Sequence, residues 1–189
     1  MRIGLFGGTF NPPHAGHRLV CEIALKRLAL DRIWLLVTPG NPLKNANGLA
    51  PLDQRMAAAD ALMRDPRIVV SDLEARIGER YTIDTLRYIL ARAPGVRFVW
   101  LMGADNLVQF NRWRAWRAIA DLAPIAVVDR PGATLKATAA KAAHALAPYR
   151  RPEAEARALP DRDAPAFVFL HDRRSPLSST ALRSGKTTD

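Results

Sequence analysis

Cysteine is almost absent from this chain of 189 residues, in which Cys21 is the single example. A disulfide within the chain is therefore excluded, and the sequence favours a reducing compartment, so we expect a cytoplasmic protein. Cys21 lies close to Val20, Ile23 and Ala24, which is typical of a small buried residue rather than of a reactive thiol. Long apolar runs are also absent. None approaches the roughly 18 residues that a membrane span requires, and no signal-peptide pattern follows Met1, so we expect no membrane partner.

Acidic residues are the minority, because 18 Asp and Glu stand against 28 Lys and Arg, for a formal net charge of +10. The excess is spread along the chain and forms no basic tail. Such a field attracts polyanions, which include nucleic acids and phosphorylated small molecules; a solvated basic surface is the alternative. The apolar content of 49% predicts a globular protein. Without an internal repeat or a dividing linker, we expect one domain over residues 1–189.

Apolar runs typical of buried strands alternate with helix-like segments along the whole chain. We expect strands at residues 2–6, 33–37, 67–70, 96–102, 124–128 and 167–170. We expect helices at residues 15–30, 52–63, 82–93, 134–146 and 178–183, with one more ending at 119–122. Residues 72–80 are expected to form a connecting loop and 150–165 an irregular segment. This alternation predicts an α/β fold, a doubly wound Rossmann-like parallel sheet with helices on both faces.

The most informative stretch is GGTFNPPHAGH at residues 7–17, which joins the first strand to the first helix. A glycine turn between strand and helix offers backbone N–H groups to phosphate. His14 and His17 are three residues apart and share one side of the first helical turn, where both can donate hydrogen bonds to a phosphate chain. Gly16 lets a ligand approach closely, and Thr9 adds a hydroxyl donor. A metal site is weakly supported, because only the distant His144 and His171 could complete it.

The same stretch resembles the first-strand motif GGTFxPxHxGH of the HxGH nucleotidyltransferases. Residue 11 is Asn where many members have Asp. Further blocks resemble one branch of that superfamily, the nicotinate-nucleotide adenylyltransferases, in the same order along the chain. These blocks are RYTIDT at 80–85, GAD at 103–105 followed by Phe110 and Trp113, RPG at 130–132, and LSSTALR at 177–183.

The resemblance implies a fold of the nucleotidyltransferase type and an enzyme of NAD biosynthesis. Its reaction joins ATP and nicotinate mononucleotide to give deamido-NAD and pyrophosphate. The acceptor phosphate would attack the α-phosphorus of ATP directly, without a covalent enzyme intermediate, so catalysis would rest on positioning and charge stabilisation. Mg²⁺ would arrive on the ATP phosphates, with no dedicated protein ligands. The partners would be these two small molecules, and we expect neither nucleic acid nor membrane.

The resemblance also assigns roles to residues of this chain. His14, His17, Lys44 and Arg183 would be catalytic. His17 would hold the α-phosphate, and Lys44 would be a mobile charge on its loop. The residues expected to bind ATP are Gly7, Gly8, Thr9, Phe10, His14, Gly16, His17, Gly103, Asp105, Ser179, Thr180 and Arg183. For Lys44, Arg183 and Asp105, a solvated surface position or a turn is the alternative interpretation.

Different residues would bind nicotinate mononucleotide, and they are Tyr81, Thr82, Thr85, Trp113 and Arg130. The resemblance implies that Tyr81 and Thr82 present backbone N–H groups to the nicotinate carboxylate, which an amide could not satisfy. Trp113 could stack on the pyridine ring, with core packing as its alternative role and Trp116 as a rival for stacking. Asp84 could order this loop or simply cap the helix.

Two features depart from the family pattern. The loop after the second strand reads Asn41-Pro42-Leu43-Lys44 and lacks the histidine that many members have, and the chain ends six residues after Arg183. Two rival functions remain. Pantetheine-phosphate adenylyltransferases share the HxGH chemistry but lack the 81–85 and 130–132 blocks. The basic, aromatic residues 112–117 suggest instead a nucleic-acid-binding module.

Overall fold

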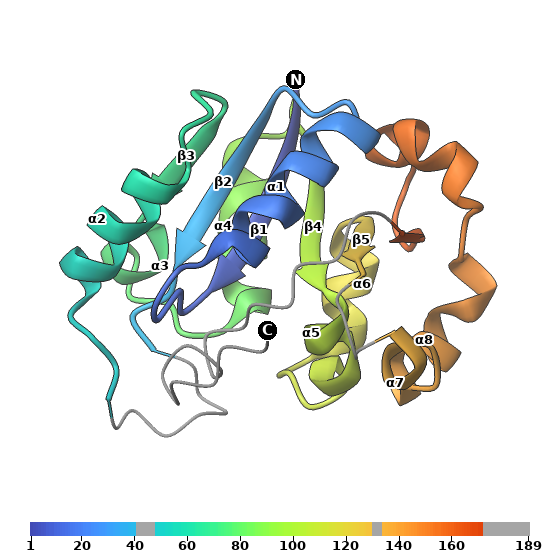
Figure 1. Cartoon of the computed structure of the whole chain (residues 1–189). Helices are drawn as coiled ribbons and strands as arrows, with labels where there is room; N and C mark the ends of the chain where they lie inside the picture. The colour runs from blue at the N-terminus through green and yellow to red at the C-terminus, as the bar shows by residue number, and fades with distance from the viewer. Residues whose placement is uncertain (41–47, 130–133, 172–189) are drawn as a thin grey trace, which may run out of the picture.

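The structure is a computed structural model that describes residues 1–40, 48–129 and 134–171 (Figure 1). Its centre is one six-stranded sheet in which all neighbouring strands are parallel, in the order β3-β2-β1-β4-β5-β6. The strands are β1 (Arg2–Gly8), β2 (Arg32–Val37), β3 (Ile68–Ser71), β4 (Arg97–Gly103), β5 (Ile125–Val128) and β6 (Phe167–Leu170). Each of the six predicted strands is present, within two residues of its expected bounds.

Helices cover both faces of this sheet, as the doubly wound prediction requires. The α-helices are α1 (Ala15–Arg27), α2 (Leu52–Leu62), α3 (Leu73–Arg76), α4 (Thr82–Arg92), α5 (Ala104–Phe110), α6 (Trp116–Leu122), α7 (Thr134–Thr138) and α8 (Lys141–Leu146). Two 3₁₀ helices follow, η1 (Ala147–Tyr149) and η2 (Glu153–Asp161). None of the helices in the described ranges is long and apolar enough to cross a membrane.

The two faces of the sheet carry separate hydrophobic cores. On one face, α1, α2 and η2 pack on side chains such as Phe6 and Leu35. On the other face, α4, α5, α6 and α8 pack on side chains such as Leu5 and Trp100. Figure 1 shows α1 in front of the sheet and α4 behind it. Successive residues of β1 therefore point into different cores, which explains why the central strands read as continuous apolar runs.

The strand order reverses at β1, which pairs with β2 on one side and with β4 on the other. The chain leaves β1 toward α1 on one face and leaves β4 toward α5 on the other face. In open parallel sheets the crevice beyond the carboxyl ends of two such strands is where ligands bind. Residues 7–17 and residues 103–105, both predicted to bind ATP, meet at this point.

Several predictions of secondary structure were wrong in detail. Helix α1 ends at Arg27 rather than Leu30, because Ala29 adopts a left-handed conformation. Helix α5 was not predicted, and α3 and η2 lie in segments expected to be irregular. The helix expected at residues 134–146 is two helices, because Ala140 is extended and begins α8. The helix expected at 178–183 lies outside the described residues.

Gly7 is a position where the fold requires the absence of a side chain. A Cβ added to Gly7 would lie 2.8 Å from Cη2 of Trp100, whose ring is 1% exposed in the core. Trp100 is held on β4, the strand beside β1, and its ring cannot move without displacing the core around it.

We expect Gly7→Ala to lower the free energy of unfolding by about 1–3 kcal/mol, because the added methyl group overpacks the core. Gly95→Ala is the matched control, since a Cβ there meets no atom within 4 Å. Denaturant unfolding of both variants measures the difference, and equal stabilities would show that Trp100 yields easily to the methyl group.

Candidate active site

His14 and His17 begin helix α1 by capping it reciprocally. Nδ1 of His14 accepts a hydrogen bond from the backbone N–H of Gly16 at 3.1 Å. In return, Nδ1 of His17 accepts one from the backbone N–H of His14 at 3.2 Å. The two rings stack with their centroids 3.7 Å apart. The pattern is that of a capping box in which histidines replace the usual hydroxyl and carboxylate side chains.

This arrangement determines which nitrogen of each ring can donate. Because each Nδ1 accepts a backbone N–H, the proton of the neutral ring is on Nε2. Both rings are therefore set to donate an Nε2–H, beside the positive end of the α1 dipole. This suits phosphate oxygens, and it disfavours a metal, which would need a lone pair on Nε2.

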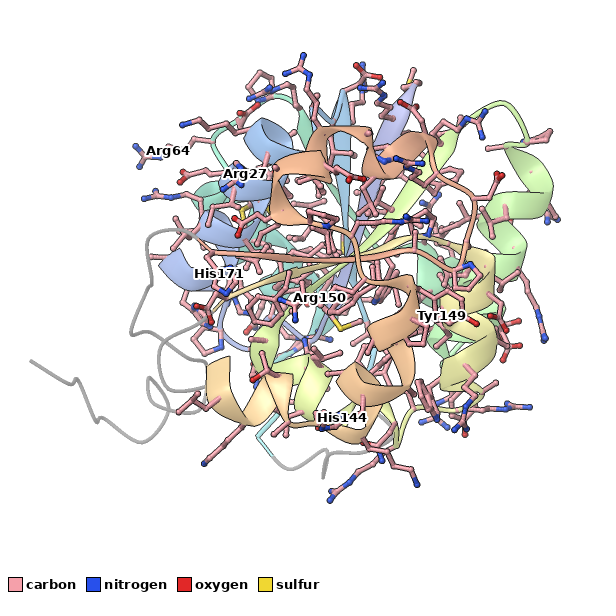
Figure 2. The ribbon with its side chains drawn as sticks, turned by 90° about the vertical axis from the view of Figure 1, so that its right-hand side faces the viewer. Arg27, Arg64, His144, Tyr149, Arg150 and His171 are labelled. Atoms are coloured by element: carbon pink, nitrogen blue, oxygen red, sulfur yellow. The ribbon has the colours of Figure 1, made fainter. Side chains whose placement is uncertain are left out.

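The other two histidines do not approach this pair. Figure 2 shows His144 on α8 and His171 after β6 at separate points of the same face of the molecule. The part of the chain that the structure describes contains no group of three or more His, Cys, Asp or Glu residues that could hold a metal ion.

The side chain of Phe10 is buried against the His17 ring and does not face the crevice. Its ring is 1% exposed and meets the His17 ring edge-on, with centroids 4.8 Å apart. Its backbone adopts a left-handed conformation, with φ of 46°. A Cβ on Gly8 would lie 3.1 Å from the Phe10 ring. Contact between Phe10 and ATP would therefore have to come from its backbone, while its side chain fixes the position of His17.

Asn11 ties the turn between β1 and α1 to the loop that returns toward α2. Its Nδ2 donates to the carbonyl of Gly48 at 2.9 Å, and its Oδ1 accepts from the N–H of Ala50 at 3.1 Å. The amide thus uses both a donor and an acceptor, which the Asp found in many family members could not do when ionised. The two hydrogen bonds join residues that are 37 and 39 positions apart in the sequence. Local sequence patterns therefore give no signal for them.

Arg55 of α2 is a second residue that sequence reasoning missed. Its side chain is buried, and it donates to the backbone carbonyls of Thr9, Thr38 and Ala50 at 2.6, 2.8 and 2.8 Å. Burial lowers the pKa of its guanidinium, although an arginine stays charged at neutral pH. The sole signal in the sequence was its position in a helix, where a charged residue is usually solvated.

The β4 side of the crevice is formed by Gly103 and Asp105. Gly103 is the last residue of β4 and the N-cap of α5, and Asp105 is exposed in the first turn of that helix. Pairing of Phe6 with Leu101 places the ends of β1 and β4 side by side. The structure therefore brings the two predicted ATP-binding segments together across the crevice.

The residues predicted to bind nicotinate surround the start of α4. Tyr81 is the N-cap and Thr82 the first helical residue, so N–H groups of this first turn are not used by the helix itself. Thr85 is fully buried, and its hydroxyl donates to Oε1 of Glu74 at 3.2 Å. Thr85 thus orders the turn from inside. Asp84 makes no side-chain cap. Its two carboxylate oxygens instead form ion pairs at 3.7 Å, Oδ1 with Nη1 of Arg87 and Oδ2 with Nη1 of Arg114.

The two candidate stacking residues lie in different environments. Trp116 is 8% exposed, and the guanidinium of Arg117 covers one face of its ring at 4.5 Å. Trp113 is only partly buried and contacts Trp100 and Phe110 through edge-on ring contacts. Trp113 is therefore better placed than Trp116 to offer a ring face to a ligand.

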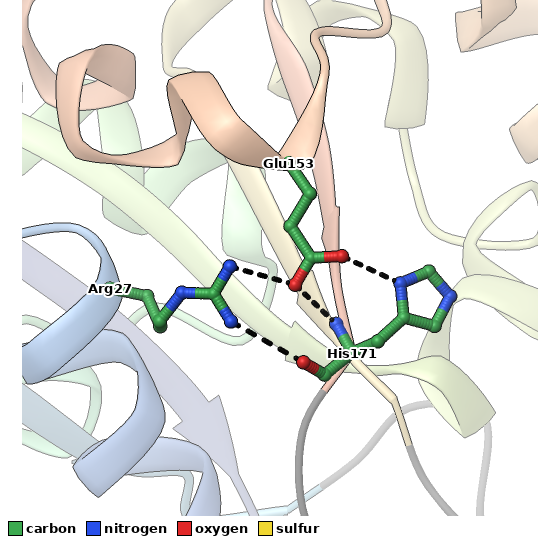
Figure 3. A network of polar contacts seen from close by, with 3 residues as sticks. All are labelled: Arg27, Glu153 and His171. Carbon is green, nitrogen blue, oxygen red and sulfur yellow. Dashed lines mark hydrogen bonds and ion pairs between the residues drawn. The ribbon is translucent and has the colours of Figure 1, made fainter.

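Five predicted site residues lie outside the described residues: Lys44, Arg130, Ser179, Thr180 and Arg183. The last of the described residues before 172–189 is His171, which is fixed by the network in Figure 3. Glu153 accepts from the N–H of His171 at 2.9 Å, pairs with its ring at 2.8 Å, and pairs with Arg27 at 2.9 Å. Burial opposes ionisation of Glu153, but these hydrogen bonds outweigh it and lower the pKa of the carboxyl. The end of β6 is thereby tied to the end of α1.

Glu74 is a buried carboxyl on α3, and its contacts cross the region between β2 and α4. Burial raises the pKa of Glu74, while hydrogen bonds from the hydroxyls of Thr38 and Thr85 act in the opposite direction. The ionised form is therefore disfavoured in the folded protein relative to the unfolded chain.

We expect the free energy of unfolding of the unmodified protein to fall, relative to that of Glu74→Gln, as the pH rises above the ordinary glutamate pKa of about 4.3. The reason is that the unfolded chain then loses the proton of Glu74 whereas burial opposes that loss in the folded protein, and glutamine keeps an acceptor for Thr85 without a charge. Thermal unfolding between pH 4 and 8 measures the difference. Thr85→Val should steepen the dependence, because it removes a hydrogen bond that lowers the pKa. Parallel stability curves for the protein and Glu74→Gln would contradict this prediction.

Residues 5–185 match the model of the family described as cytidylyltransferase-like. The chain is 59% identical to a "Probable nicotinate-nucleotide adenylyltransferase" of Methylorubrum extorquens, over 97% of this chain and 100% of that protein. It is 55% identical to a protein of the same name in Agrobacterium fabrum, over 97% and 98%.

Solved structures show the same fold. A nicotinic acid mononucleotide adenylyltransferase of Plasmodium falciparum complexed with NaAD superimposes with a TM-score of 0.72 at 15% identity, covering 97% of this chain and 82% of that one. The same enzyme complexed with APC gives a TM-score of 0.70 at 14% identity, with the same coverage. With the sequence relatives at 55–59% identity over nearly its whole length, this chain belongs to the nicotinate-nucleotide adenylyltransferase family, within the cytidylyltransferase-like proteins.

Proposed function

We propose that this protein transfers the adenylyl group of ATP to nicotinate mononucleotide, giving deamido-NAD and pyrophosphate, as a step of NAD biosynthesis. The observation that carries the proposal is the pair of stacked, reciprocally capped histidines at the switch point of the sheet. The relatives named as nicotinate-nucleotide adenylyltransferases, and the structural neighbours complexed with APC and with NaAD, support it. The single cysteine, which is buried, fits a cytoplasmic location.

In this reaction the acceptor phosphate attacks the α-phosphorus of ATP in line, and pyrophosphate leaves. The protein supplies no nucleophile, so its work is to align two anions and to stabilise the charge that develops between them. His17 would donate its Nε2–H to the α-phosphate, and His14 would donate to the neighbouring phosphate oxygens. Lys44, Ser179, Thr180 and Arg183 would complete the phosphate contacts. Mg²⁺ would enter as part of the ATP complex and reduce the repulsion between the two substrates.

Selection of the acceptor would depend on the start of α4. Backbone N–H groups of Tyr81 and Thr82 would bind the nicotinate carboxylate, and Trp113 would stack on the pyridine ring. Arg130 would pair with the acceptor's phosphate. An amide in place of the carboxylate would direct an NH₂ group at those N–H donors and leave them unpaired.

A nucleic-acid-binding role receives less support from the geometry of residues 112–117. The guanidinium of Arg114 lies 4.6 Å over the Tyr81 ring and near Asp84, while Arg117 lies over Trp116. These arginines are therefore engaged by the protein's own aromatic and acidic groups rather than arranged as a stacking surface for bases.

The purified protein, supplied with ATP, Mg²⁺ and nicotinate mononucleotide, should release pyrophosphate. Nicotinamide mononucleotide should give a much lower kcat/KM, because a site built for a hydrogen-bonded group rejects an analogue that leaves donors unpaired. Pyrophosphate release coupled to a colorimetric assay measures both reactions. A protein silent with both acceptors but active with 4′-phosphopantetheine would support the rival adenylyltransferase, and salt-sensitive RNA binding without turnover would support the nucleic-acid module.

His17→Ala should lower kcat by about 10²–10³-fold, the range reported for loss of one preorganised donor at a developing charge. The matched control is Lys26→Ala, an exposed residue in the last turn of the same helix, which should keep its activity. Circular dichroism of both variants checks that the fold is retained. Turnover near that of the unmodified protein in His17→Ala would remove His17 from the phosphate site.

A further inference from the structure

A buried arginine lies directly behind the phosphate-binding turn. Arg55 is 2% exposed, and its Nη1 donates to the carbonyls of both Thr9 and Thr38. Its Nε donates to the carbonyl of Ala50, just before α2 begins. One guanidinium therefore joins three segments that are far apart in sequence: the turn after β1, the end of β2 and the start of α2.

Arg55 acts where the hydrogen bonding of the sheet ends. The pairing of β1 with β2 ends at Gly8 and Val37, and the N–H of Thr38 makes a final hydrogen bond to the carbonyl of Gly8 at 3.0 Å. Beyond this point the segments that follow β1 and β2 diverge, yet the backbone carbonyls of Thr9 and Thr38 still require hydrogen-bond donors. The fork of Arg55 supplies them, so it extends the connection between the strands by one residue into the turn.

Asn11 contacts the same peptide of Ala50 as Arg55 does. The peptide of Ala50 is held at both ends, since its N–H donates to Asn11 and its carbonyl accepts from Arg55. Thr9 and Asn11 are thus both attached to the segment around Ala50, through Arg55 in one case and directly in the other. The segment between Gly8 and His14, which leads into α1 and its two histidines, is therefore held at Thr9 and Asn11 by these hydrogen bonds.

The charge of Arg55 adds to this effect. Among the described residues, no acidic side chain forms a salt bridge with Arg55, and its partners are all backbone carbonyls. A buried cation beside the turn therefore contributes positive potential to a site that must hold a phosphate chain.

We propose that Arg55 is a positioning residue for the phosphates of ATP, acting through the carbonyls of Thr9, Thr38 and Ala50 to set the turn that carries His14 and His17. This inference rests on the proposed adenylyl transfer. It assigns the dependence to ATP, because Arg55 donates to the carbonyls of Thr9, Thr38 and Ala50 and makes no hydrogen bond to the start of α4, where the acceptor would be selected.

The test compares Arg55→Met and Arg55→Lys with the same two changes at Arg64, which is exposed just beyond α2 and projects from the surface in Figure 2. We expect kcat/KM for ATP to fall about 10²-fold in Arg55→Met, the loss typical of a displaced catalytic group. Arg55→Lys keeps the charge but lacks the fork, so an intermediate loss of roughly tenfold is expected. The KM for nicotinate mononucleotide and both Arg64 variants should change by less than about twofold.

Kinetics are measured well below the melting temperature of each variant, so that a loss of stability alone leaves the folded fraction with unaltered constants. Calorimetric titration of ATP and Mg²⁺ without acceptor gives ATP affinity independently of turnover. An Arg55→Met variant that folds and keeps its kcat/KM and affinity for ATP would overturn the inference. If that variant does not fold, unaltered ATP kinetics in Arg55→Lys would do so.

Failure of the proposed function gives a different result. The unmodified protein and the Arg64 variants would then release no pyrophosphate, whatever the state of Arg55. In that case the ATP titration still decides the inference, because weaker ATP binding in Arg55→Met than in Arg64→Met supports it and equal binding overturns it.

Discussion

The two hydrogen bonds by which the rings of His14 and His17 cap helix α1, from the backbone N–H groups of Gly16 and His14, are the interaction on which the candidate site depends. They satisfy the first N–H groups of α1, which a helix cannot satisfy by itself, and they hold both rings by the nitrogen that faces the backbone. In the neutral form of each ring, this places the proton on the other nitrogen, Nε2. One pair of residues therefore starts the helix, and the proposed function assigns phosphate binding to the same two side chains.

A layer of buried residues supports this pair without facing the crevice. Phe10 packs beneath His17, Asn11 and Arg55 attach the turn to the segment around Ala50, and Trp100 fills the space that Gly7 leaves open. Each contact bridges elements that converge at the carboxyl edge of the parallel sheet. The strands bring these elements together, and the buried side chains then fix their relative positions to the precision that alignment of two anionic substrates requires.

The acceptor side is organised by a different set of contacts. Glu74 joins the end of β2 to the inside of α4 through Thr38 and Thr85, and Arg114 packs over Tyr81 from outside. The start of α4 is thus contacted on its buried side by Glu74 and on its outer side by Arg114. In the proposed function, this division separates the residues that would hold the donor nucleotide, on β1 and α1, from those that would select the acceptor of the adenylyl group.

The sequence by itself determined the strands, the α/β class, the glycine turn between β1 and α1, and the family, because these depend on apolar periodicity and on motifs within a few residues of each other. Only the tertiary structure decided that Thr85 is buried against Glu74, that Trp116 is covered by Arg117, and that Asn11 and Arg55 meet around Ala50. The physical reason is that a charged residue in a helix reads as solvated until its neighbours are known. Arg55 is buried because three carbonyls from separate segments converge on it, and no local pattern records that convergence.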